Sequence, residues 1–167
     1  MKILREVDLS EIDEYLKSLG GGNHKDNMDR MREHKRYFEV ALTHDEFKAL
    51  VFLHTPKLSR LVSLFDRSLK QTAENAIVLL NAGDVEIDSN WNLQHLVDQF
   101  EESFHESDLK LSNLLLRDVK PGEKRQENAE WYLQDGCHRA LAYMIYLLRE
   151  NQTYNEQSAF LATNTEF

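Results

Sequence analysis

A strand that leads through a glycine turn straight into an apolar helix is the feature that most constrains how this chain folds. Residues 131–133 read Trp-Tyr-Leu, which predicts a strand, and Asp135 and Gly136 predict a tight turn. The helix follows from about Cys137 to about Arg149, because apolar side chains recur there at spacings of three and four. A strand and a helix joined so closely must pack as layers, which predicts an α/β protein.

Three other segments predict further strands. Residues 1–7, 114–116 and 159–163 are short apolar runs, and a polar turn at 118–128 with Pro-Gly separates the second run from the strand at 131–133. A first helix follows the opening strand. Ser10 can cap it, and the glycines at 20–22 end it.

The middle of the chain predicts helices. Residues 24–36 are polar without a clear period, which indicates a loop or a solvated helix. Thr43 and Glu46 form a capping box for a helix that Pro56 ends. A second helix spans 58–80 by its apolar period, and Ser89 or Asn90 caps a third whose stripe runs from Leu93 to Phe104.

Composition limits the classes of protein that remain. The length of 167 residues fits one domain, 1–167, and the net charge of -9 disfavours binding to nucleic acid backbones and anionic membranes. No window is long and apolar enough for a membrane span, and the N-terminus has no secretory leader pattern. The single cysteine, Cys137, cannot form an intramolecular disulfide. These features predict a soluble, cytoplasmic protein without a membrane partner.

The turn before the apolar helix has the chemistry of a phosphate site. A helix start presents backbone amides and the positive end of the helix dipole, and Gly136 lets a ligand approach the backbone. His138 and Arg139 add two side-chain donors in the first helical turn. At the same place, the dipole and the neighbouring positive charge favour a thiolate at Cys137, and Asp135 could bind a metal, act as a base or cap the helix.

Each of these residues also has a purely structural interpretation. Asp-Gly is a common turn before a helix, Arg139 could simply pair with Asp135, and Cys137 could be a small buried side chain. Histidines recur at 24, 34, 44 and 54, but that interval fits neither a strand nor a helix face. No cysteine or carboxylate cluster accompanies them, so we predict no metal site.

The block at 130–143, EWYLQDGCHRALAY, resembles the signature of the ParB and sulfiredoxin superfamily. Sulfiredoxins carry Gly-Cys-His-Arg at this turn, and free serine kinases and many ParB-like proteins carry Asp-Gly-X-His-Arg. The resemblance covers the last third of the chain well and the first twenty residues loosely. It implies a small mixed sheet of the ParB/sulfiredoxin type, with a large helical insertion at about 36–105 in place of the family's single linking helix. That insertion could be a substrate lid, an oligomerisation element or a docking surface for a partner.

The same resemblance implies the ligands. Gly136, Cys137, His138 and Arg139 would contact the phosphates of ATP, ADP or CTP, with Mg²⁺ as an accompanying ion, and Asp135, Cys137 and His138 would be the catalytic residues. Asp135 matches the kinase and ParB patterns rather than the sulfiredoxin one. In the kinases a glutamate from the N-terminal segment is the base, for which Glu11 and Glu14 are the nearest candidates.

Three functions follow from these observations. The favoured one is an enzyme that carries out ATP- or ADP-dependent phosphoryl chemistry on a small-molecule or protein acceptor. The alternative is a nucleotide-gated module that binds protein or DNA without phosphotransfer, with nuclease activity as a variant of it. The third is a small interaction protein that keeps the fold without its chemistry.

Overall fold

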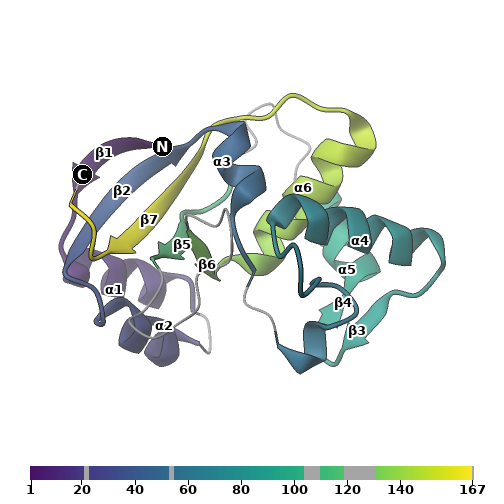
Figure 1. Ribbon diagram of the computed structural model, residues 1–167, viewed down its shortest axis with the longest axis horizontal. Coiled ribbons are helices and arrows are strands. Elements are labelled where there is room, and N and C mark those ends of the chain that lie inside the picture. Colours follow the sequence, from purple (N-terminus) through teal and green to yellow (C-terminus); the bar gives the residue numbers. More distant parts are fainter. Residues whose placement is uncertain (21–22, 53–54, 104–109, 119–130, 167) are drawn as a thin grey trace.

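Five strands form the mixed sheet on which the molecule is built. The computed structural model describes residues 1–167 except 21–22, 53–54, 104–109, 119–130 and 167. The strands, in their order across the sheet, are β1 (Lys2–Glu6), β2 (Arg36–Leu42), β7 (Gln157–Thr163), β5 (Leu114–Arg117) and β6 (Tyr132–Asp135). Neighbours are antiparallel except β7 and β5, which are parallel. The chain is therefore an α/β protein with a mixed sheet, as predicted (Figure 1).

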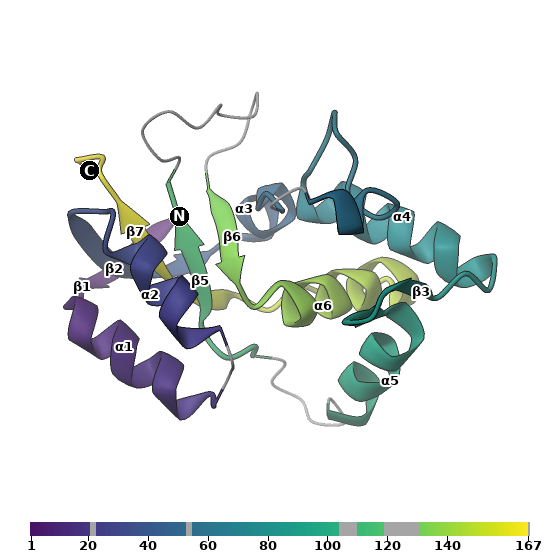
Figure 2. The same cartoon turned by 90° about the horizontal axis from the view of Figure 1, so that it is seen from below.

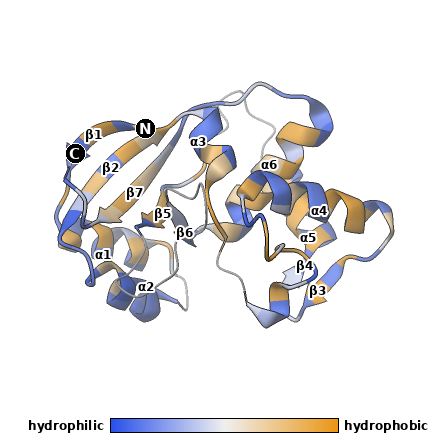
Figure 3. Cartoon of the chain, viewed as in Figure 1, coloured by the Kyte–Doolittle hydropathy of each residue, from blue (hydrophilic) through white to orange (hydrophobic). Residues whose placement is uncertain are grey.

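One face of the sheet is covered by α1 (Leu9–Ser18) and α2 (His24–Met31) (Figure 2). Ile12 and Leu16 of α1 and Met28 and Met31 of α2 pack with Phe160 of β7 in one buried cluster. In the segment 24–36, predicted as either a loop or a solvated helix, residues 24–31 therefore form a helix with one buried side. Figure 3 shows how few hydrophobic residues it has, which is why no period was visible in the sequence.

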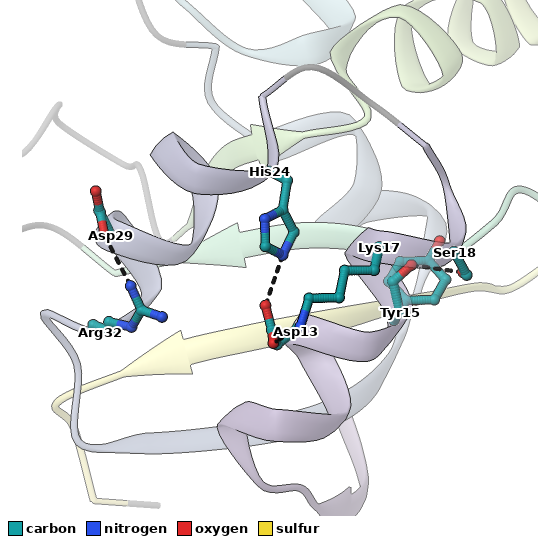
Figure 4. Close-up of polar contacts among 7 residues, drawn as sticks. All are labelled: Asp13, Tyr15, Lys17, Ser18, His24, Asp29 and Arg32. Atoms are coloured by element: carbon teal, nitrogen blue, oxygen red, sulfur yellow. Dashed lines mark hydrogen bonds and ion pairs between the residues drawn. The ribbon is translucent and has the colours of Figure 1, made fainter.

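An ion pair also ties these two helices together. The Nε2 atom of His24, the first residue of α2, lies 2.6 Å from Oδ1 of Asp13 on α1, and Lys17 contacts the other carboxylate oxygen at 2.6 Å (Figure 4). Contacts with Lys17 and His24 lower the pKa of Asp13, and Lys17 contributes more. The polar sides of α1 and α2 are therefore linked by these contacts, and their apolar sides are held together by packing.

The other face carries the larger core, where α3 (His44–Ala49), α4 (Leu69–Asn81), α5 (Leu93–Ser103) and α6 (Cys137–Glu150) gather (Figure 1). α6 packs against both α4 and α5 and buries residues along most of its length. Its predicted start and end are confirmed. The predicted capping box of α3 is confirmed too, since Glu46 accepts from the backbone amide of Thr43 and Thr43 Oγ1 accepts from that of Glu46.

The segment predicted as a helical insertion, at about 36–105, does not begin with a helix. Residues 36–42 form β2, which lies inside the sheet between β1 and β7. The alternation of Phe38, Val40 and Leu42 on one face is the strand signal that the prediction missed. The helices of the insertion lie between residues 44 and 103.

The predicted helix over 58–80 is wrong in its first half. Leu58 ends a short 3-10 helix, η1 (Pro56–Leu58), and α4 starts only at Leu69. The backbone amide of Leu69 donates to the carbonyl of Leu50 at 2.7 Å, and that of Phe52 donates to Arg67 at 2.9 Å. These long-range hydrogen bonds hold the preceding loop out of the helix.

A small hairpin before α5 was also missed. β3 (Glu86–Asp88) and β4 (Trp91–Asn92) pair antiparallel, and α5 follows at once. Asn92 rather than Ser89 or Asn90 caps α5, because its Oδ1 accepts from the backbone amide of His95 at 2.9 Å. The predicted turn at 118–128 lies almost wholly outside the described residues. Within the described ranges, every helix is too short or too polar to cross a membrane.

Candidate functional site

Gly136 fixes the backbone between β6 and α6. It is the N-cap residue of α6 with φ of 86°, in the left-handed region, and no side chain caps the helix there. A Cβ atom at this position would lie 2.6 Å from Cδ2 of buried Leu114 and 3.1 Å from Nη2 of Arg139. The turn therefore requires glycine, and the start of α6 keeps its amides and its dipole uncapped by a side chain.

Arg139 lies one helical turn after Asp135, its acidic neighbour. Its Nη2 is 3.9 Å from Oδ2 of Asp135, and about a third of each side chain is exposed. An ion pair at this distance is loose and contributes little to stability. A guanidinium group has five N–H donors, so Arg139 retains the capacity to bind an anion.

His138 is held from outside its own helix. Its ring stacks on that of Trp91 with centroids 3.9 Å apart, and its Nε2 lies 3.2 Å from the carbonyl oxygen of Asn90. Burial lowers the pKa of His138 from its ordinary value, while the Asn90 carbonyl and the carboxylates of Asp135 and Asp88 act in the opposite sense. The imidazole is therefore mostly neutral near pH 7.

The pKa of the Cys137 thiol is shifted in the direction opposite to the one that the sequence predicts. Burial, with a contribution from the Asp135 carboxylate, raises the pKa of its thiol to about 12. The Sγ atom donates to the carbonyl of Leu133 at 3.7 Å, and the side chain packs against the main core. At neutral pH Cys137 is a protonated thiol rather than a nucleophile.

A cavity of about 570 Å³ opens beside the first turn of α6. His138, Arg139 and Ala142 of α6 line it on one side. The other walls come from α5 and from the segment before β5: Leu96, Gln99, Phe100, Glu102, Lys110, Leu111 and Ser112. The cavity brings His138 and Arg139 together as predicted, whereas Asp135, Gly136 and Cys137 lie at the turn without lining it.

Sequence reasoning missed the α5 wall and Lys110. The apolar stripe of α5 reads as plain packing, and Glu102 falls on what looks like its solvated side. Lys110 has no motif around it. Among the described residues that line the cavity, Lys110 and Arg139 are basic and Glu102 is acidic, in a chain whose net charge is -9. The local charge therefore favours an anion although the global charge does not.

The N-terminal glutamates lie elsewhere. Glu11 accepts from the backbone amide of Asp8 at 3.0 Å and from Arg5 Nη1 at 2.6 Å, so it caps α1. It lines a second cavity, of about 520 Å³, formed by residues 6–9, Glu11 and residues 35–37. Neither Glu11 nor Glu14 lines the cavity at α6, whose described lining includes Glu102 and whose Arg139 lies beside Asp135.

The histidines at intervals of ten take unrelated places. His24 pairs with Asp13, His34 is buried with Nδ1 3.2 Å from the Arg30 carbonyl, and His44 stacks on Tyr154. The fourth, at position 54, lies outside the described residues. Among the residues with described positions, no three histidine, cysteine or acidic side chains group closely enough to hold a metal ion.

Comparison with known proteins finds no family model, no curated protein and no solved structure that matches this chain.

Proposed function

We propose that this chain is a cytoplasmic nucleotide-binding enzyme that uses ATP or ADP in phosphoryl chemistry at the start of α6. The observation that carries the proposal is the meeting of His138, Arg139 and Lys110 in one cavity of about 570 Å³ beside an uncapped helix start. The volume is typical of small-molecule sites. A helix N-terminus with two cationic side chains favours an anionic ligand such as phosphate.

The residues at the turn fit a phosphate group. Gly136 gives the turn a left-handed backbone at a place where any Cβ would collide with Leu114, and the amides of Cys137 to Arg139 belong to the first helical turn. The resemblance of residues 130–143 to the ParB and sulfiredoxin superfamily points to the same group of ligands, with CTP as a further candidate.

The side chains divide into distinct roles. A bound ATP or ADP supplies the phosphoryl group. Arg139 and Lys110 hold negative charge that increases on the phosphate oxygens, and Asp135 or Glu102 accepts the proton of a small-molecule or protein acceptor. Mg²⁺ typically binds through one or two carboxylates together with phosphates, so these two acids could suffice for it. Cys137, a half-buried side chain with a protonated thiol, supports the turn by packing.

Isothermal titration with ATP, ADP, CTP and GTP, with and without Mg²⁺, tests the proposal. Arg139→Gln should weaken binding about 10- to 100-fold, because one charge-assisted hydrogen bond contributes about 1.5–3 kcal/mol. Arg149→Gln is the matched control, since Arg149 lies in the last turn of the same helix. Absence of binding by the wild type, or equal losses in both variants, would contradict a phosphate site at the start of α6.

A second candidate is a nucleotide-gated module that binds a protein or, against the net charge, DNA, with nuclease activity as a minor variant. Leu64 and Phe65, which are 72% and 94% exposed in the loop before α4, favour it. Exposed apolar side chains that lie close together in the chain are typical of interaction surfaces. Release or transfer of phosphate from ATP by the wild type distinguishes the enzyme from the module.

A further inference from the structure

The β3–β4 hairpin, and not the α6 turn, determines how His138 is held. The Asn90 carbonyl lies 3.2 Å from Nε2 of the imidazole, and the Trp91 ring stacks on it at 3.9 Å with an angle of 29° between the planes. Asn90 and Trp91 belong to the insertion, about 45 residues before the motif. The insertion therefore contacts the motif histidine directly.

The hairpin is itself fixed in place. The backbone amide of Asn90 donates to Oδ1 of Asp88 at 2.7 Å, and that of Leu93 donates to the carbonyl of Val85 at 2.8 Å. The Trp91 ring also meets buried Phe52 edge-on, with centroids 6.3 Å apart. The Asn90 carbonyl and the Trp91 ring are therefore positioned before any ligand binds.

This arrangement decides which ring nitrogen carries the proton. A carbonyl oxygen only accepts hydrogen bonds, so Nε2 of His138 must be the N–H donor. In the neutral ring, Nδ1 then has a lone pair and repels an anion. Protonation converts Nδ1 into a second donor, and the ring becomes a cation in a cavity that Arg139 and Lys110 already make positive.

We propose that the β3–β4 hairpin makes His138 a proton-controlled anion ligand, with Asn90 and Trp91 as positioning residues that fix the Nε2–H form and leave Nδ1 to respond to pH. The anion in question is the phosphate of the proposed function, and this part of the inference rests on that proposal. The choice of tautomer does not, because it follows from contacts within the protein.

The groups around His138 set the direction of the effect. Three groups favour the charged imidazole: the carboxylates of Asp135 and Asp88 and the face of the Trp91 ring. Two cations that line the same cavity, Arg139 and Lys110, disfavour it, and the carboxylate of Glu102 partly offsets them. Burial outweighs the favourable contacts, so the pKa of His138 lies below 6.5. Anion affinity therefore rises as the pH falls toward that pKa, and a bound anion raises it.

Nitrogen-15 NMR of the imidazole rings tests the tautomer without any nucleotide. The His138 signals, assigned by their loss in His138→Gln, should show the Nε2–H form near pH 8 and a titration midpoint below 6.5 in the wild type. Trp91→Ala should expose the ring further and raise the midpoint, because the loss of burial outweighs the loss of the favourable contact with the indole face. Trp91→Phe should keep the midpoint near that of the wild type. An Nδ1–H tautomer in the wild type, or the same midpoint in Trp91→Ala as in the wild type, would overturn the inference.

Binding of inorganic sulfate tests the coupling, because sulfate keeps its charge across the range from about pH 5 to about pH 8 in which histidine titrates. Wild-type affinity should rise by up to about tenfold per pH unit, the limit for one linked proton, whereas binding to His138→Gln should be flat with pH. An equal pH dependence in His138→Gln overturns the coupling. Sulfate binding by neither protein at any pH contradicts the proposed phosphate site itself, and the NMR result then still decides the tautomer.

Discussion

At the scale of single residues, both local sequence and tertiary packing determine the conformation and identity of Gly136. The Asp-Gly pair predicts a turn from the sequence alone, but the need for glycine comes from Leu114 on β5, a residue 22 positions earlier. Sequence could therefore predict the turn and the helix start, and it could not predict what fills the space beside the Gly136 Cα.

We expect Gly136→Ala to lower the free energy of unfolding by roughly 1–3 kcal/mol from backbone strain alone, with a further loss from the contact with Leu114. Leu114 is fully buried, so its side chain has little room to move away. Gly83→Ala is the matched control, because Gly83 also has positive φ but nothing within 4 Å of its Cβ position. Urea unfolding of both variants measures the difference, and equal losses would show that the Leu114 contact is unimportant.

Cys137 shows how far a motif can mislead about a single residue. Its place at a helix start predicts a lowered thiol pKa, yet burial raises the pKa to about 12. The burial comes from packing against the core, which no local pattern encodes.

The folded protein should therefore react very slowly with a thiol reagent such as DTNB near pH 8, since almost all of Cys137 is protonated there. Unfolding in urea should restore the rate of an ordinary cysteine. Cys137→Ser should still bind nucleotide if the thiol has no part in the site. Rapid labelling of the native chain would contradict the buried thiol.

At the scale of elements, local signals worked where capping and periodicity decide the structure. The strand, turn and helix from Tyr132 to Glu150 and the capping box at Thr43 follow from neighbouring residues. The loop before α4 was missed because its hydrogen-bond partners lie elsewhere in the chain. The β3–β4 hairpin pairs locally, but its strands of three and two residues are too short to show a period, and the alternation in β2 was overlooked. Ser10 was the wrong cap for α1, since Asp8 and Glu11 form the capping box there.

Two substitutions separate a true cap from an apparent one. Thr43→Ala should cost about 1 kcal/mol, because Thr43 caps α3 through its reciprocal contacts with Glu46. Ser10→Ala should change stability very little, since Ser10 lies inside the first turn of α1. Chemical denaturation compares them, and a larger loss in Ser10→Ala would contradict the assignment of the caps.

At the scale of the whole molecule, ionisable groups predict how stability changes with pH. Hydrogen bonds and ion pairs hold the pKa values of Glu11, Asp13 and Asp45 below their ordinary values, so their contribution is present above about pH 4 and is lost as the pH falls through the lower folded-state pKa values. Burial raises the pKa of Tyr143 and Tyr154, whose contribution is lost as the pH rises above about 10.

Two histidines add a third limit. Burial lowers the pKa of His44 and His138, so each favours the neutral ring and stability starts to decline as the pH falls below about 6.5. Thermal unfolding followed from pH 3 to pH 11 should show a plateau from about pH 7 to about pH 9, with losses on both sides. A maximum near pH 5 would contradict these assignments.

The segment between β2 and β5 contributes at each of these scales, because it supplies a wall of the cavity through α5 and the support of His138 through the β3–β4 hairpin. Its contribution to the candidate site could not be predicted from the motif, which contains only the α6 side. The central claim is that phosphate binds where the start of α6 meets the segment that contains α5.

Amide chemical-shift mapping with ADP tests that claim most directly. We expect the largest shifts at the backbone amides of Cys137, His138 and Arg139, and smaller shifts on α5 and at residues 110–112. In Arg139→Gln these shifts should be lost. Shifts centred on the second cavity around Glu11 and Tyr37, or no shifts at saturating ADP, would contradict the claim.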